Sequence, residues 1–95
     1  MISFIVRFKF APEDRAEMAE TLRQLAEASR QEPGCVSYTP HHVEDDPDTV
    51  VIYEQYKDTK ALNAHRASEH FQKLAVGALF QRMRERQIEN LTALI

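Results

Sequence analysis

The chain has 95 residues, of which 43% are hydrophobic and 28% are charged, and its formal net charge is −3. This length predicts a single domain over residues 1–95, whose small core would gain from a partner. The composition excludes the basic bias of a nucleic-acid-binding protein and the run of roughly 18 apolar residues that a membrane helix needs.

The few cysteines and glycines exclude several classes of site. One cysteine, Cys35, cannot form an internal disulfide, and two glycines cannot supply a dinucleotide fingerprint or a phosphate-binding loop. The first residues alternate between apolar and polar, unlike the continuous apolar block of a signal peptide. We therefore expect a cytoplasmic protein that works without a nucleotide or a tightly held flavin.

The first elements are a strand and a helix. Residues 2–10 place apolar side chains at every second position, which is the period of a strand. Pro12 suits the first turn of a helix, and apolar residues then recur at helical spacing. Pro33-Gly34 ends this helix and has the chemistry of a turn.

Two further strands follow along the chain. The pattern predicts a strand at about 35–43, a hairpin loop at 44–48 and a third strand at 49–57. The third strand is apolar on both faces from Val50 to Tyr53, so both of its faces need a cover.

The second half predicts a broken helix and a last strand. Asp58 or Thr59 can cap a short helix, Ser68 can cap the next one, and a last strand is predicted over 88–95. The order β-α-β-β-α-β predicts an α+β, ferredoxin-like fold with a four-stranded antiparallel sheet. Its two helices would cover one face of the sheet, and a second copy of the chain, packed sheet on sheet, would cover the other. We expect a homodimer.

Two ionisable residues fall on apolar surfaces and are the leading candidates for chemistry. His65 lies on the apolar stripe of the short helix, where a core histidine bonded to a backbone carbonyl is the alternative to a catalytic one. Glu54 shares a strand face with Ile52 and Tyr56. Burial there would raise its pKa, although pairing with a cation such as Arg7 is equally consistent with the pattern.

The four histidines do not predict a metal site. His41 and His42 are neighbours on a strand and point to opposite faces. His65 and His70 are separated by a predicted helix break, so they are not the i, i+4 pair that chelates from one helical face. We expect no structural or catalytic metal.

Residues 32–72 carry a set of strings that resembles the antibiotic biosynthesis monooxygenase domain family. The strings are EPGC before a strand with Tyr38, then YEQYKD, then ALNAH and S-x-HF, and the start IVRFKFAPED also fits. The resemblance implies a dimeric α+β barrel in which two sheets face each other. Haem-degrading relatives are disfavoured, because the chain has no tryptophan and residues 2–10 contain no asparagine.

The resemblance also implies an activity. Characterised members include cofactor-independent monooxygenases of quinols and polyketide-like phenols, in which the substrate anion itself reduces dioxygen. A relative with a similar Tyr-Glu-Ala-Tyr-Lys-Asp stretch isomerises a phosphorylated dione, so a cofactor-free isomerase is the alternative, and a non-catalytic dimer that binds a small ligand is a third. The candidate catalytic residues are His65, Glu54 and Tyr56, the last as a donor to the substrate oxygen; the candidate substrate-binding residues are Arg7, Tyr38, His70 and Phe71.

Overall fold

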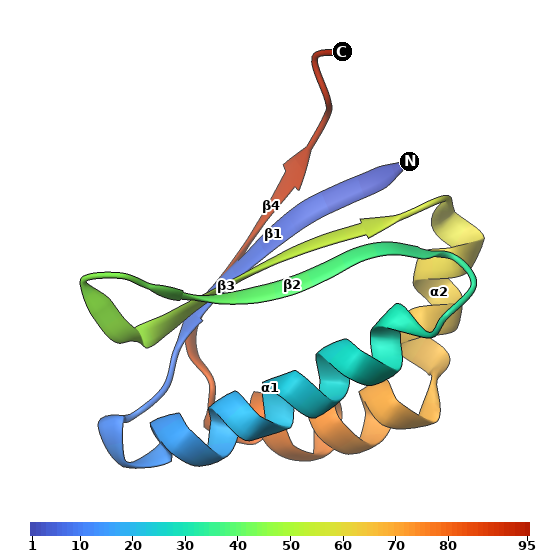
Figure 1. Ribbon diagram of the computed structural model, residues 1–95. Coiled ribbons are helices and arrows are strands. Elements are labelled where there is room, and N and C mark those ends of the chain that lie inside the picture. The colour runs from blue at the N-terminus through green and yellow to red at the C-terminus, as the bar shows by residue number, and fades with distance from the viewer.

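The computed structural model describes residues 1–95, and it confirms the α+β, ferredoxin-like fold (Figure 1). The strands are β1 (Ile2–Lys9), β2 (Cys35–Val43), β3 (Asp46–Tyr56) and β4 (Arg84–Leu91), in the sheet order β2-β3-β1-β4 with every neighbouring pair antiparallel. The helical segments are η1 (Pro12–Asp14), α1 (Arg15–Arg30), α2 (Thr59–Ala67), the π-helical η2 (Phe71–Leu79) and α3 (Phe80–Arg82). None of the helices combines the length and the apolar character that crossing a membrane requires.

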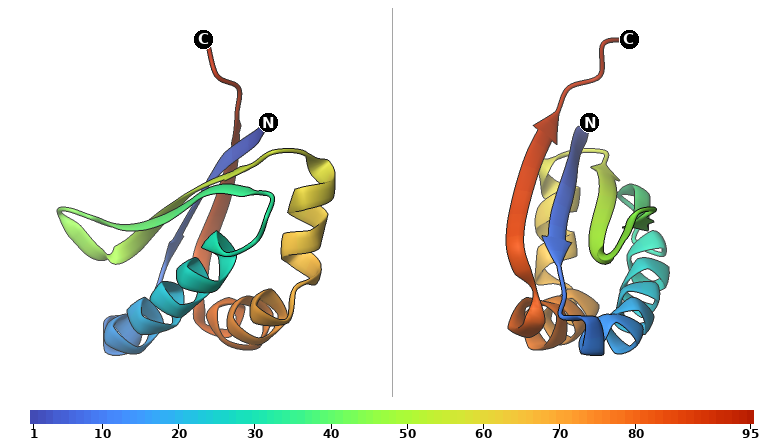
Figure 2. Two further views of the ribbon diagram at one scale, coloured as in Figure 1. Left: turned by 45° about the vertical axis from the view of Figure 1, so that its right-hand side comes forward. Right: turned by 90° about the vertical axis from the view of Figure 1, so that its left-hand side faces the viewer.

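The core lies between the sheet and the helices on one of its faces. Alternate residues of β1 face this core, and Phe4, Val6 and Phe8 are all buried there. Leu22 and Leu25 of α1 pack against them from the other side. Figures 1 and 2 show α1 and η2 side by side beneath the sheet, with α2 at its end.

The opposite face of the sheet carries no helix. Ile5 of β1 lies across from Tyr53 of β3, and Val51 lies beside them on the same face. All three side chains remain half-buried in the single chain. This is the two-sided apolar character that the sequence predicts for the third strand.

The hairpin between β2 and β3 is shorter than predicted. Strand β2 has the expected bounds, but β3 begins at Asp46, so that only Glu44 and Asp45 form the turn. Pro47 does not prevent pairing, because a proline near the start of a strand gives up a donor that the ladder does not need. The prediction of a loop over 44–48 was wrong for this reason.

The last strand also differs from its prediction. It covers Arg84–Leu91 and not 88–95, and all of its residues are exposed. An edge strand with polar residues on both faces lacks the alternation by which a strand is recognised. Its placement is set by the end of α3 and by pairing with β1.

Gly34 holds the turn after α1 close to α2. A β-carbon built at Gly34 would lie 2.3 Å from the Cβ of Ala61. We expect Gly34→Ala to lower the free energy of unfolding by about 1–3 kcal/mol, since one side of the contact must move. The midpoint of urea unfolding measures this. Gly77→Ala is the control, because its nearest contact is at 3.3 Å, and an equal loss in both variants would contradict the packing argument.

Candidate functional site

Strand β3 carries Glu54 into the core. The side chains of Ile52, Glu54 and Tyr56 alternate along β3 toward the helices, and Glu54 is only 6% exposed. Phe4 of β1 and Tyr38 of β2 are its neighbours across the sheet. A carboxyl group is therefore surrounded by aromatic and aliphatic side chains, which is costly unless other polar groups contact it.

Helix α2 brings His65 to the same place. The Asp58 carboxylate accepts a hydrogen bond from the Ala61 amide at 2.8 Å, which confirms the predicted cap. Ser68 ends the helix: its hydroxyl donates to the His65 carbonyl at 2.6 Å and accepts from the Phe71 amide at 3.2 Å. His65 lies on the buried side of this short, fixed helix and is 2% exposed.

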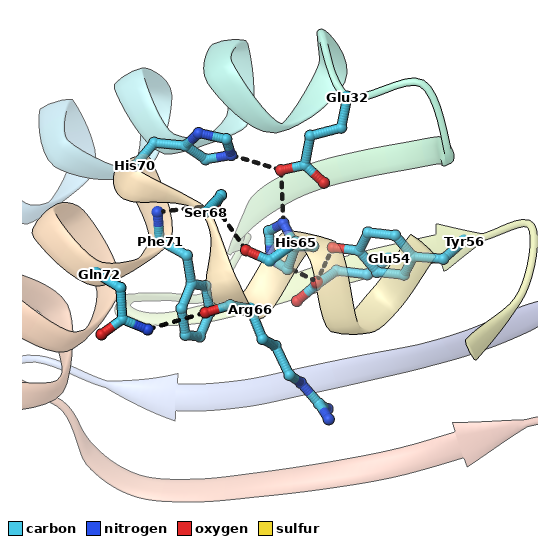
Figure 3. Close-up of polar contacts among 9 residues, drawn as sticks. All are labelled: Glu32, Glu54, Tyr56, His65, Arg66, Ser68, His70, Phe71 and Gln72. Carbon is cyan, nitrogen blue, oxygen red and sulfur yellow. Dashed lines mark hydrogen bonds and ion pairs between the residues drawn. The ribbon is translucent and has the colours of Figure 1, made fainter. Parts of the chain in front are cut away.

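The polar side chains form a continuous row (Figure 3). His65 Nδ1 lies 2.9 Å from Glu32 Oε2, and His65 Nε2 lies 3.8 Å from Glu54 Oε1. The Tyr56 hydroxyl donates to Glu54 Oε1 at 2.6 Å. His70 Nε2 contacts the same Glu32 oxygen at 2.5 Å. When Glu32 is ionised, Nδ1 of His65 carries the proton and Nε2 presents its lone pair toward Glu54.

Burial sets the proton affinities in this row. It raises the pKa of Glu54 to about 7, against the opposing effects of the Tyr56 hydrogen bond and the positive charge of Arg66. Burial lowers the pKa of His65, although the hydrogen bond to Glu32 acts in the other direction. Near neutral pH the imidazole is thus neutral, and the Glu54 carboxyl is divided between its two protonation states.

The phenols beside the row hold their protons firmly. Burial raises the pKa of Tyr38 well above its usual value, and burial together with the Glu54 charge raises that of Tyr56. Both tyrosines are hydrogen-bond donors at any physiological pH. Tyr56, at 0% exposed, gives its hydrogen bond to Glu54. Donation from Tyr56 to a substrate oxygen, as predicted, would require this hydrogen bond to Glu54 to be exchanged.

Glu54 and His65 both line a cavity with a volume of about 50 Å³. This is room for a few water molecules, so a larger ligand must displace part of the wall. Phe71 and Phe80 are in edge-to-face contact at this wall, with ring centroids 5.9 Å apart. The remaining wall is mainly apolar, and it includes Phe4, Val6, Tyr38, Leu62, Leu79, Met83 and Ile88.

One set of side chains has the composition of a metal site. Ligand atoms of Glu32, His65 and His70 all lie within 4.8 Å of one another. Two histidines and one carboxylate are a ligand set that zinc and iron accept. Both histidines contact Glu32 although a helix break separates them, and their spacing in the sequence does not reveal this arrangement. In the structure both histidines are hydrogen-bonded to the same oxygen, Glu32 Oε2.

The structure brings most of the predicted site residues together. His65 and Glu54 lie side by side, Tyr38 and Phe71 line the cavity, and His70 supports the row through Glu32. Arg7 is not part of this site: it pairs with Val51 on the open face of the sheet. Arg7 therefore cannot be the cation that pairs with Glu54, because the two side chains lie on opposite faces of the sheet.

Two residues of the site, Glu32 and Arg86, were not predicted from the sequence. Glu32 was noticed only as part of the EPGC string, although its carboxylate contacts His65, 33 residues further on. Arg86 lines the cavity from β4, whose position was predicted four residues too late. No spacing rule connects either residue to the cavity, because only the folded sheet and helices bring these segments together.

The fold and the site define a small ferredoxin-like protein with a buried Glu-His-Glu row beside an apolar cavity. Residues 1–76 match the model of the family described as antibiotic biosynthesis monooxygenase. The chain belongs to this family, and the resemblance noted in the sequence is confirmed.

The relatives agree with this assignment. The chain is 32% identical over 72 residues to "Putative monooxygenase YcnE" of Bacillus subtilis, a match that covers 76% of each chain. It is 31% identical over 70 residues to "Putative monooxygenase Rv0793" of Mycobacterium tuberculosis, covering 74% of this chain and 68% of that one. A crystal structure of an antibiotic biosynthesis monooxygenase superposes with a TM-score of 0.91 at 30% identity over the full length of both chains.

Proposed function

We propose that the protein is a cofactor-independent monooxygenase of quinol-like or aromatic polyketide-like molecules. The observation that carries this proposal is the Glu54 carboxyl, whose pKa is raised to about 7 at the wall of an apolar cavity. A general base works best when its pKa is near the working pH. Family membership supports the reaction class, and the substrate class is our inference.

In the proposed reaction, ionised Glu54 removes a proton from an activated CH₂ or phenol group of the bound substrate. For a CH₂ group, the resulting carbanion gives electrons to dioxygen and forms a C–O bond. Protonation by Glu54 gives a hydroperoxide. Its O–O bond breaks, water leaves and a ketone remains, so that CH₂ and O₂ become C=O and H₂O.

The other residues of the row support this step. Glu32 holds His65 by Nδ1, so that Nε2 faces the reacting end of the cavity. The neutral imidazole can relay the proton between Glu54 and the peroxide oxygen. Tyr56 donates to Glu54 and favours its ionised form, which keeps the base available at neutral pH. The apolar wall excludes water from the carbanion.

The proposed working unit is a homodimer in the cytoplasm. The half-buried face with Ile5, Val51 and Tyr53 would pack against its copy, and the cytoplasm would keep Cys35 reduced. Sedimentation at micromolar concentration tests the dimer. The prediction is a mass of twice 11.0 kDa.

A cofactor-free isomerase of a phosphorylated dione is the second candidate. It uses the same base, but its enediolate is reprotonated and no oxygen is consumed. The observation that favours it is the presence of two arginines, Arg66 and Arg86, at the cavity. A purely ligand-binding dimer predicts that His65 and Glu54 are fully paired with protein groups and face no cavity. Both are paired, with Glu32 and Tyr56, but both also line a cavity, so this alternative is less well supported.

Oxygen uptake tests the proposal. We expect protein-dependent uptake with a panel of quinols and anthrones, and a loss of about 10²-fold in kcat/KM in His65→Ala, the usual effect of removing a group that transfers protons. His42→Ala is the control, because that histidine is exposed on β2. Uptake that is equal in both variants would remove His65 from the mechanism, and dione conversion without uptake would favour the isomerase.

A further inference from the structure

The cavity has two arginines at its wall, and they come from different parts of the chain. Arg66 follows His65 on α2, and Arg86 lies near the start of β4. Figure 3 shows the Arg66 side chain directed away from the Glu32–His65 pair and toward the β1 and β4 side of the site. The Arg86 guanidinium carbon lies 5.2 Å from the centroid of the Phe80 ring, which is part of the cavity wall.

A bulge at the start of β4 places Arg84 and Arg86 on opposite faces of the sheet, although they are only two residues apart. Glu85 has a positive φ of 53°, and the pairing of β4 with β1 shifts register between Arg7 and Lys9. As a result Arg84 pairs with Lys9 on the open face, whereas Arg86 lies on the same side as Ile88. Bulges of this kind redirect side chains and are common beside functional sites.

Neither guanidinium at the cavity has an acidic partner. Only Arg15, Arg23 and Arg82 form ion pairs with carboxylates. Arg7, Arg30 and Arg84 form none either, but they do not line the cavity. Arg66 and Arg86 form no ion pair, although both are close enough to Glu54 for their charges to oppose the rise of its pKa. The protein has a net charge of −3, whereas the cavity wall carries two arginines and one carboxyl group, that of Glu54.

We propose that Arg66 and Arg86 form a subsite for an anionic substituent of the substrate, a carboxylate or a phosphate. The planar guanidinium groups match such an anion with paired hydrogen bonds. The apolar ring of the ligand lies against Phe71 and Phe80, with its reactive end at Glu54 and His65. The inference rests on the proposed function for the identity of that reactive end, but the subsite itself is a binding property.

Two matched ligands test the subsite. The probes are 2,5-dihydroxybenzoate and its methyl ester, which are quinols that differ in one negative charge. Their dissociation constants are measured by NMR titration of the full-length protein without oxygen, at pH 7.5, so that turnover does not interfere. We expect the acid to bind about three- to tenfold more tightly than the ester, the range that charge-assisted hydrogen bonds at a partly exposed site provide.

Three variants identify the residues responsible. Arg66→Gln and Arg86→Gln should each remove most of the preference for the acid and leave binding of the ester unchanged. Arg84→Gln is the matched control, since it lies two residues away on the opposite face. Equal binding of acid and ester, no saturable binding of either, or the same loss in the Arg84 and Arg86 variants would overturn the subsite.

Phosphate is distinguished from carboxylate by repeating the titration with phenyl phosphate. Preference for this ligand over the acid, lost in the two cavity variants, assigns the subsite to a phosphate; the reverse order assigns it to a carboxylate. The proposed function can fail separately: Arg-dependent binding without any oxygen uptake keeps the subsite and removes the monooxygenase. Oxygen uptake with no preference for the acid keeps the monooxygenase and removes the subsite.

Discussion

Glu54→Gln is expected to lower kcat/KM for oxygen uptake by about 10²- to 10⁴-fold, the range that a positioned general base contributes. The substitution keeps the shape of the side chain, and the amide oxygen can still accept from the Tyr56 hydroxyl that now bonds Glu54 at 2.6 Å. What it removes is the group that takes the proton. The oxygen electrode, with an anthrone as substrate, measures this directly.

The pH profile identifies the base. Because the pKa of Glu54 is raised to about 7, kcat/KM of the native protein should rise as the pH increases through that value. The residual kcat/KM of Glu54→Gln should not rise with pH in this range. Glu27→Gln is the control, because it changes an exposed carboxylate on α1, away from both the cavity and the open face of the sheet. Native-like turnover in Glu54→Gln would exclude Glu54 as the base.

The same substitution is expected to stabilise the protein at alkaline pH. Glu54 has a usual pKa of 4.5 and a pKa of about 7 in the folded chain, so the folded state binds more protons between these values. Stability contributed by the protonated form is therefore present below pH 4.5 and lost as the pH rises to about 7. The difference in pKa corresponds to about 3 kcal/mol at pH 8.

Urea unfolding of both proteins between pH 4.5 and 8.5 checks this expectation. Glu54→Gln should exceed the native protein in free energy of unfolding by about 3 kcal/mol at pH 8, with the difference nearly gone at pH 4.5. The control Glu27→Gln should show no such trend. A difference that does not change with pH would mean that Glu54 is ionised at low pH and that the burial argument is wrong.

The main elements of the fold could be predicted because their patterns are local. Alternation along β1, helical spacing in α1 and the Asp58 cap each determine a short segment, and the structure confirms all three. The edge strand β4 could not be predicted, since its residues are exposed and show no period. The π-helical form of η2 was also missed, because its apolar residues suit an ordinary helix equally well.

The candidate site divides in the same way. His65 and Glu54 were found because each is an ionisable residue on an apolar stripe, and the structure buries both. Glu32 gives no such signal, since it stands in a polar turn at the end of α1. Its role depends on a contact with His65 that only tertiary packing produces. Arg86 lies two residues before Ile88 on the cavity side of β4, and it was missed because the start of this exposed strand was predicted four residues too late.

Isotope labelling tests the central claim most directly. Metal-stripped protein is supplied with an anthrone under ¹⁸O₂, and the product is analysed by mass spectrometry. The account predicts protein-dependent formation of the ketone with one ¹⁸O atom, and none with Glu54→Gln above the background without protein. A product without ¹⁸O, or label that appears only when metal is restored, would contradict cofactor-independent oxygenation.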